Sequence, residues 1–437
     1  MRPSRPPRLI RITLLLLLSL LFHLTSGSRP RPHVLSKRNP TFSPISLTSP
    51  TFQQLSQLSN LDENFDWKDE NSVLSKVLIP RTVGSKNLKK IQEMFVDKFK
   101  KLGWHVEKDE FTTSTPRGLK TFTNLIFIHD PLAIRRFTLS AHLDSKISPQ
   151  GFVGATDSAV PCVLLYDLAS SLNDWLNERK KRVVEEEGGE EGRDGVQGET
   201  LQIVLFDGEE AFEEWSSIDS IYGARHLVEK WESTTTDSKV PGITPSATRL
   251  EPRNELEKIS HFVLLDLLGS KNPVIRNFYQ NTGWLFDEFL HSEEKLGRSG
   301  LLWPNSPNLK GNEYVKVSKD FRRKEKSFFV DRKSPQSWIG TIEDDHLPFL
   351  KKGVPIVHLI SVPFPKVWHT LEDDSSTLDL DTIKAWALII RLTVAEYLGL
   401  DPEIQRRPTE NKRQELISRS FDKEEEEEMC STTKDMR

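Results

Sequence analysis

The chain has 437 residues, enough for one large α/β domain or two ordinary domains with a sizeable core. Its 60 Lys and Arg residues against 64 Asp and Glu residues give a formal net charge of -4, and the lack of a basic excess argues against a nucleic-acid partner. Only Cys162 and Cys430 are present, which excludes a disulfide-rich framework. We expect them not to pair, because Cys162 lies in an apolar run and Cys430 in an acidic tail.

Residues 1–27 have the pattern of a targeting signal. Arginines precede an apolar run over residues 12–24, and the small residues Thr25, Ser26 and Gly27 follow it. The run is shorter than the ~20 residues of a comfortable membrane span. We therefore expect a cleaved signal peptide, a secreted protein and no stable membrane insertion after cleavage. An uncleaved anchor in the endoplasmic reticulum or Golgi is the alternative.

Residues 28–70 are rich in Ser, Pro, Thr and Gln and predict a flexible lead-in, so the folded domain is expected over residues 71–400. Apolar periodicity there predicts strands at 104–112, 121–128, 137–141, 201–206, 259–265 and 354–360. It predicts helices at 87–102, 163–176, 220–231, 282–296 and 381–398, and a short helical turn after 342–346. Polar stretches are expected to form surface insertions at 179–199 and 232–257 and a disordered tail at 401–437.

This alternation of strands and helices predicts the fold class. It is typical of an α/β three-layer sandwich, in which helices cover a central mixed, mostly parallel sheet. Open sheets of this kind build their sites at the C-terminal ends of the strands. Chemistry-bearing residues at those ends are therefore the candidates for function.

The apolar run at 201–206 ends in Asp207, Gly208, Glu209 and Glu210. After Gly208 the chain can turn and bring both glutamates toward one cleft. Adjacent acids there suit a division of labour in which one holds a metal and the other moves protons. A solvated loop of acids is the alternative for this motif taken alone.

Two carboxylates and one imidazole follow strands in three separate segments: Asp157, Glu210 and His369. With a fourth position left open, this is a ligand set for catalytic zinc. Glu209, beside a ligand, is then the natural general acid and base. Asp266 ends its own strand and could be a second metal ligand or an acceptor for a substrate amine.

Further residues near these acids admit two interpretations each. Asp344 and Asp345 could support Asp266, because carboxylates in close contact tend to share a proton. Their alternative is a helix N-cap and a first-turn acid. Trp215, Phe364 and Trp368 flank the acids and could wall a narrow, partly dry pocket, although core packing explains most aromatic residues.

Five blocks of the sequence resemble the glutaminyl-peptide cyclotransferases, the animal-type glutaminyl cyclases, which share their fold with zinc aminopeptidases. The similarity runs from about residue 77 to residue 400. The blocks occur in the family's order, at residues 151–162, 205–227, 264–273, 342–360 and 363–374.

This resemblance implies conversion of an N-terminal glutamine, on a peptide or protein substrate, to pyroglutamate with release of ammonia. It implies one zinc ion per chain, held by Asp157, Glu210 and His369. Glu209 would take a proton from the α-amino group and return it to the departing amide nitrogen, which Asp266 and Asp344 would bind. The residues implied to line or support the substrate pocket are Trp215, Phe364, Trp368 and His358. We expect a monomer.

Two positions depart from the family's pattern. Ala141 stands where the animal enzymes have a cysteine that pairs with the counterpart of Cys162, so that bridge is lost. Glu343 replaces a glutamine, which could alter substrate preference.

Two rival functions remain open on the sequence. A two-zinc aminopeptidase of the same fold would use ligand types that are all present, and spacing alone does not exclude a second metal. The residues that provide these ligand types are His142, Asp144, Asp157, Glu209, Glu210, Asp266 and His369. A catalytically silent binding protein would have lost Glu209 or His369, and neither is lost.

Overall fold

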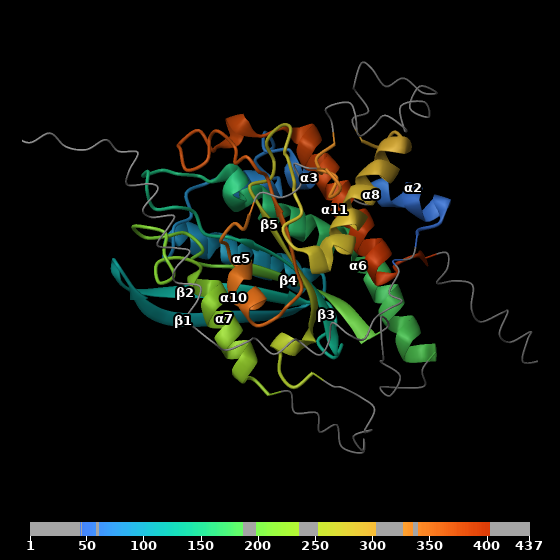
Figure 1. Cartoon of the computed structure of the whole chain (residues 1–437), viewed down its shortest axis with the longest axis horizontal. Coiled ribbons are helices and arrows are strands. Elements are labelled where there is room, and N and C mark those ends of the chain that lie inside the picture. Colours follow the sequence, from blue (N-terminus) through green and yellow to red (C-terminus); the bar gives the residue numbers. More distant parts are fainter. Residues whose placement is uncertain are drawn as a thin grey trace, which may run out of the picture. The chain divides into compact units, whose positions relative to one another are not determined.

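The computed structural model describes residues 44, 46–57, 61–186, 198–235, 252–302, 327–334 and 340–402. The expected signal peptide, Cys430 and almost all of the expected tail lie outside them. Six described strands form one sheet in the order β1-β2-β4-β3-β5-β6 (Figure 1). Their bounds are His105–Thr115 (β1), Gly118–Ile128 (β2), Arg135–His142 (β3), Glu199–Phe206 (β4), Ile259–Asp266 (β5) and Ile356–Ile360 (β6).

The sheet is mixed. Strands β4, β3, β5 and β6 pair in parallel, whereas β2 is antiparallel to both β1 and β4. Only a tight turn separates β1 from β2, and such a short connection permits only antiparallel pairing. Strand β4 is buried along its whole length, as its nearly unbroken apolar run over residues 201–206 predicted.

Helices cover both faces of the sheet. In β4, Ile203 and its alternate neighbours face α5, α6, α8 and α11, while Val204 and Phe206 face α7 and α10. The predicted three-layer sandwich is therefore confirmed. The bounds are Lys86–Lys101 (α5), Val160–Glu186 (α6), Tyr222–Ser233 (α7), Gly283–Arg298 (α8), His346–Lys351 (α10) and Leu380–Leu398 (α11). Shorter elements are α4 (Val73–Val77), the π-helix η3 (Ala155–Ala159) and the 3-10 helices η6 (Leu256–Lys258), η7 (Gln280–Thr282) and η9 (Ser375–Thr377).

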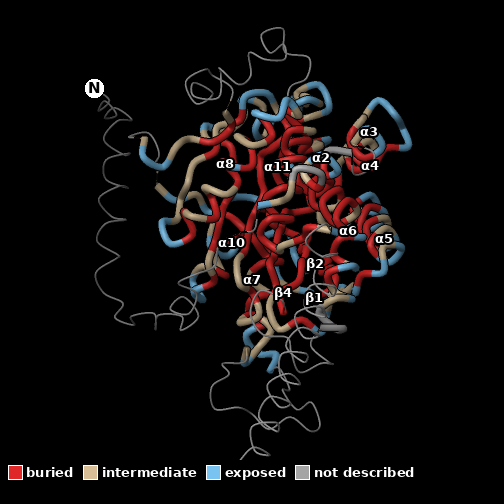
Figure 2. The backbone as a smooth tube through the Cα atoms, turned by 90° about the vertical axis from the view of Figure 1, so that its right-hand side faces the viewer, coloured by how far each residue is buried: buried red, intermediate tan, exposed pale blue. Residues whose placement is uncertain are grey.

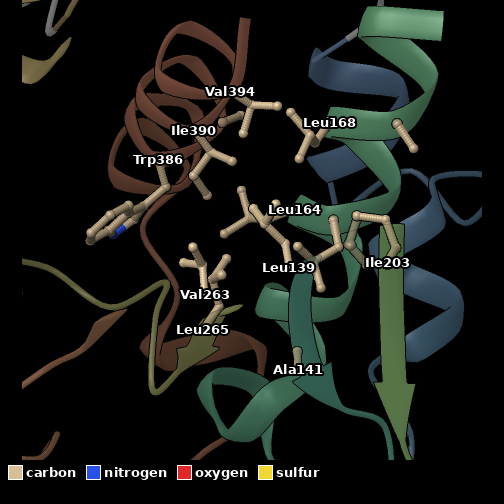
Figure 3. Close-up of a cluster of buried hydrophobic side chains, with 14 of the residues drawn as sticks. Leu139, Ala141, Leu164, Leu168, Ile203, Val263, Leu265, Trp386, Ile390 and Val394 are labelled. Carbon is tan, nitrogen blue, oxygen red and sulfur yellow. The ribbon is translucent and has the colours of Figure 1, made fainter. Parts of the chain in front are cut away.

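The larger core lies between the sheet and helices α6 and α11. Leu139, Ile203 and Val263 are buried there, from three neighbouring strands. Figure 3 shows them beneath Leu164 of α6 and Ile390 of α11. This packing fixes the strands relative to one another, and therefore also the loops at their ends. Figure 2 shows the resulting buried interior.

The structure corrects the expectation of a flexible lead-in over residues 28–70. Helices α2 (Ser49–Gln57) and α3 (Leu61–Phe65) lie within that range, and Leu55 and Phe65 are fully buried. Thr51 Oγ1 donates to Asp401 Oδ1 at 2.7 Å, so the first and last described segments hold each other. The domain therefore includes residues on both sides of the predicted limits, 71 and 400.

The predicted insertion at 179–199 begins as helix rather than as loop, because α6 continues to residue 186. Arg179 is buried and donates to the Glu199 carbonyl at 2.6 Å, which ties the end of the helix to the start of β4. Cys162 is a buried free thiol whose Sγ donates to the His142 carbonyl at 3.0 Å. In the described part of the chain, no helix is long and apolar enough to cross a membrane.

Candidate active site

Three parallel strands end in the residues that build the site. His142 ends β3, Asp266 ends β5, and the loop that carries Glu209 and Glu210 follows β4 directly. These strands are adjacent and run in the same direction, so their C-terminal ends lie at one edge of the sheet. His369 reaches the same edge from the loop after β6.

The loop after β4 turns as its glycine predicted. Gly208 has φ +78°, and a Cβ there would lie 2.4 Å from the Phe122 ring. The Asp144 carboxylate accepts the next three backbone N–H groups: Gly208 at 2.9 Å, Glu209 at 3.1 Å and Glu210 at 3.2 Å. This anchoring role of Asp144 is not visible in the sequence, where it reads only as a possible ligand.

The three predicted ligands come together. Ligand atoms of Asp157, Glu210 and His369 all lie within 4.8 Å of one another. His369 Nε2 is 3.4 Å from Asp157 Oδ2 and 3.7 Å from Glu210 Oε2. Asp157 Oδ2 and Glu210 Oε1 are buried without a hydrogen-bond partner among the described residues. Buried carboxylate oxygens need a cation or donor, so this cluster fits a bound metal ion.

Lys146 is a site residue that the sequence reasoning missed. Its Nζ lies 3.1 Å from Glu210 Oε2. Burial raises the pKa of Glu210 to about 7, and the charge of Asp157 adds to the shift while Lys146 opposes it. Burial would raise the pKa of Asp157, but the neighbouring imidazoles of His142 and His369 outweigh it, so the pKa of Asp157 is lowered. No local sequence pattern marks a lysine that meets the loop from another strand end.

A second cluster shares Asp157 with the first. His142, Asp157 and Asp266 offer ligand atoms within 4.8 Å of one another. Its oxygens have hydrogen-bond donors: His142 Nε2 donates to Asp157 Oδ1 at 3.0 Å, and Ser158 Oγ, from outside the cluster, donates to Asp266 Oδ1. The pKa of His142 is raised well above its usual value, since surrounding carboxylates, Glu209 foremost, outweigh burial.

Glu209 has the environment of a proton carrier. It is 7% exposed, and its pKa is raised well above the ordinary value by burial and by the charges of Glu210, Asp344 and Asp345, against the opposing effect of His142. The predicted turn therefore brings both glutamates into one buried cluster. The alternative of a solvated acidic loop is wrong.

Asp344 and Asp345 behave differently from each other. His358 Nε2 donates to Asp344 Oδ2 at 2.8 Å, and this bond holds the pKa of Asp344 low in spite of burial. Asp345 is fully buried with no hydrogen-bond partner for either oxygen in the described structure, and burial followed by the Asp344 charge raises its pKa well above normal. Asp345 occupies the N-cap position of α10, as the alternative expected, but its carboxylate accepts no hydrogen bond from the helix.

Asp344, His346 and His358 form a third group with metal-ligand atoms within 4.8 Å. The two imidazole rings lie 4.5 Å apart, and Tyr279 Oη is hydrogen bonded to His346 Nε2 at 2.5 Å. Burial lowers the pKa of His346 to about 3, which keeps its ring neutral. His358 is buried, and its hydrogen bond holds the Asp344 carboxylate in place.

Aromatic side chains border the acids without being core residues. Trp215 is 38% exposed and Trp368 40% exposed. The Phe364 and Trp368 ring centroids lie 4.8 Å apart, and Trp368 stacks on His369 at 3.9 Å. Half-exposed rings beside buried carboxylates are typical of the rim of a binding cleft.

Comparison with known proteins agrees with this geometry. The model of peptidase family M28 matches residues 124–394. The glutaminyl-peptide cyclotransferase of Drosophila melanogaster is 37% identical over 82% of this chain and 87% of its own length, and the Bos taurus enzyme is 34% identical over 92% of this chain and its full length. The crystal structure of Macrostomum lignano glutaminyl cyclase superposes with a TM-score of 0.66 at 32% identity, covering 86% of this chain and all of that one. The chain therefore belongs to peptidase family M28 and, within it, to the glutaminyl-peptide cyclotransferases.

Proposed function

We propose that this chain is a zinc-dependent glutaminyl cyclase, which converts the N-terminal glutamine of peptides or proteins to pyroglutamate and releases ammonia. One observation carries the proposal: Asp157, Glu210 and His369 converge with unpartnered carboxylate oxygens directly beside the buried Glu209. Family membership supports the same activity. We also propose, from the sequence, that the enzyme enters the secretory pathway and acts as a monomer.

We assign one zinc ion per chain to Asp157, Glu210 and His369. The unpartnered oxygens Asp157 Oδ2 and Glu210 Oε1 support this cluster, whereas the second cluster is closed by its own hydrogen bonds. When bound, the ion polarises the γ-carbonyl of the substrate glutamine and stabilises the negative charge that develops on its oxygen, an effect worth several kcal/mol.

The side chains of the protein then transfer one proton and bind the departing amide nitrogen. Glu209 accepts a proton from the substrate α-amino group, whose nitrogen forms a bond to the γ-carbonyl carbon and closes a five-membered ring. Glu209 returns that proton to the amide nitrogen as the carbon–nitrogen bond breaks, and ammonia leaves. A raised pKa suits both steps, because the carboxyl must gain and lose the proton with comparable ease.

Asp344 and Asp266 are positioned to hold that nitrogen. Asp344 is kept ionised by His358 and can accept a hydrogen bond, while burial raises the pKa of Asp266 to about 6. The proposed roles of Trp215, Phe364 and Trp368 are to exclude water and to keep the glutamine side chain curled toward its own amine. Such positioning is the main requirement of an intramolecular attack.

The second candidate is a two-zinc aminopeptidase. It is favoured by one observation, that the second cluster of metal-type ligands shares Asp157 with the first. Such an enzyme needs an attacking water and releases free amino acids from ordinary peptides.

The test is an assay of the purified enzyme with a peptide that begins with glutamine. We expect ammonia release and a mass loss of roughly 17 Da, the mass of the NH3 expelled on ring closure. A chelator should abolish both, and added zinc should restore them. Release of the free N-terminal amino acid, with no loss of roughly 17 Da from the uncleaved peptide, would favour the aminopeptidase.

A further inference from the structure

A groove runs between helices α7 and α10, next to the site. The two helices lie side by side in Figures 1 and 2, and the groove between them has a volume of about 270 Å³. Its lining includes the apolar residues Val228 from α7 and Leu347 and Pro348 from α10, among polar and charged side chains. The proposed reaction uses none of these residues.

The groove borders the site: Ile221, one of its lining residues, donates its backbone N–H to the Glu209 carbonyl at 2.8 Å. Trp215 and Glu343 line the groove, and the Trp215 indole Nε1 donates to Glu343 Oε2 at 3.1 Å. Glu343 immediately precedes Asp344 in the chain, and Trp215 follows the loop that carries Glu209. This rim therefore offers a path along which a substrate whose N-terminal residue lies in the site can send the rest of its chain outward.

We propose that this groove is a subsite for the peptide residues that follow the N-terminal glutamine, and that Glu343 makes it favour a basic residue directly after the glutamine. The inference rests on the proposed function. It names the class of peptide that the site takes, one in which lysine or arginine stands second.

The charged side chains that line the groove are Glu229 and Glu343 against Arg225, Lys351 and Lys352, and Glu343 is the one that neighbours Asp344 in the chain. Arg225 is held by its own surroundings, donating to the Ser220 and Ile218 carbonyls at 3.1 and 3.2 Å, and Lys352 pairs with Glu232 at 2.5 Å. Glu343 accepts only a neutral indole N–H within the described residues, so its charge is not neutralised there. Because Glu343 is exposed, a substrate cation beside it would gain an attraction that salt screens.

The substrate's length provides an independent prediction. The apolar lining residues of the groove can contribute only when the peptide extends beyond its second residue. We therefore expect a tetrapeptide amide to have a higher kcat/KM than glutamine amide, even when its second residue is alanine.

The experiment compares tetrapeptide amides that begin Gln-Lys, Gln-Ala and Gln-Glu, with kcat/KM measured from ammonia release. For the wild-type enzyme at low salt we expect the Gln-Lys peptide to exceed the Gln-Glu peptide by about five- to tenfold, and salt to reduce the ratio. Glu343→Gln keeps an acceptor for Trp215 and should bring the ratio close to one, while Glu343→Lys should invert it. Glu214→Gln removes an exposed acid near Trp215 that does not line the groove, and should preserve the ratio.

Two outcomes would overturn the proposal. If all three peptides and glutamine amide are cyclised with equal kcat/KM, the subsite is wrong and the proposed function stands. If no glutamine peptide is cyclised, the proposed function fails and the subsite fails with it.

Discussion

Asp144 organises the site without being assigned to the metal. Its carboxylate accepts three successive backbone N–H groups, and that arrangement fixes the direction in which Glu209 and Glu210 leave the turn. Groups that hold a ligand in place contribute strongly to metal affinity, even though they never touch the ion. Asp144 is therefore a positioning residue.

We expect Asp144→Asn to lower metal affinity and turnover together, by about 10- to 100-fold. An asparagine offers one acceptor oxygen where the carboxylate offers two. Its NH2 group would face backbone N–H donors, with which it cannot form a hydrogen bond. Asp219→Asn is the matched control, because Asp219 accepts the N–H groups of residues 212–214 in the same way outside the metal cluster. Metal content and kcat measured on both variants decide the matter, and equal losses in the two would contradict the positioning role.

Glu209→Gln should separate proton transfer from metal binding. The amide keeps the volume of the side chain but cannot accept the substrate's proton, so kcat should fall by roughly 10²- to 10⁴-fold. Zinc content should change little, because Glu210 and not Glu209 belongs to the ligand cluster. Glu213→Gln, at an exposed acid three residues beyond Glu210, is the control. Turnover that survives in Glu209→Gln would remove Glu209 from the mechanism.

Several site residues could be predicted from sequence because their signals are local. Gly208 marks the turn, and the strand ends mark where Glu210 and Asp266 lie. Lys146 and Asp144 could not be assigned roles, because those roles are hydrogen bonds made across the sheet edge to residues more than 60 positions away. Periodicity reports which face of an element is apolar and says nothing about such partners.

The same limit explains the errors in the helices. The strands and long helices of the sandwich carry strong apolar patterns, and their predicted positions agree with the structure to within a few residues at most ends. Helices α2 and α3 are short, and polar contacts with distant segments hold them: Asn64 donates to Asp167 at 2.8 Å and Thr51 to Asp401 at 2.7 Å. A Ser- and Gln-rich segment that depends on such contacts has the composition of a disordered one.

Helix α8 carries a buried acid that should make stability depend on pH. Glu293 is fully buried and accepts from the Phe328 N–H at 2.6 Å, and burial raises its pKa to about 8. Between its ordinary pKa of 4.5 and about 8, the folded chain holds a proton that the unfolded chain releases. The free energy of unfolding should therefore fall as pH rises through this window.

The measurement is urea denaturation of wild type and Glu293→Gln at several pH values from 5 to 8. As the pH rises, the unfolding free energy of the wild type minus that of Glu293→Gln should fall by up to ~1.4 kcal/mol per pH unit, since one proton is involved. Asp97→Asn changes an exposed acid on α5 and should leave the wild-type pH dependence in place. A pH-independent difference between wild type and Glu293→Gln would show that Glu293 is ionised in the folded chain.

The fold as a whole brings two candidate metal clusters together around Asp157, and this is where cyclase and aminopeptidase differ. One cluster has unpartnered oxygens and the other is closed by hydrogen bonds from His142 and Ser158. A second ion would have to break both of those bonds. We therefore expect one ion rather than two.

We expect the purified protein to bind one zinc ion per chain, measured by elemental mass spectrometry, and zinc titration of the chelated protein to saturate at that ratio. Binding to the folded chain alone stabilises it by ~2.7 kcal/mol at 100 times the dissociation constant, so chelation should lower Tm by several degrees. His369→Ala removes a ligand of the first cluster only and should abolish both the zinc and the Tm shift. His142→Ala removes a ligand of the second cluster only and should leave zinc bound. Two ions per wild-type chain, with one lost in each variant, would reverse the assignment and favour the aminopeptidase.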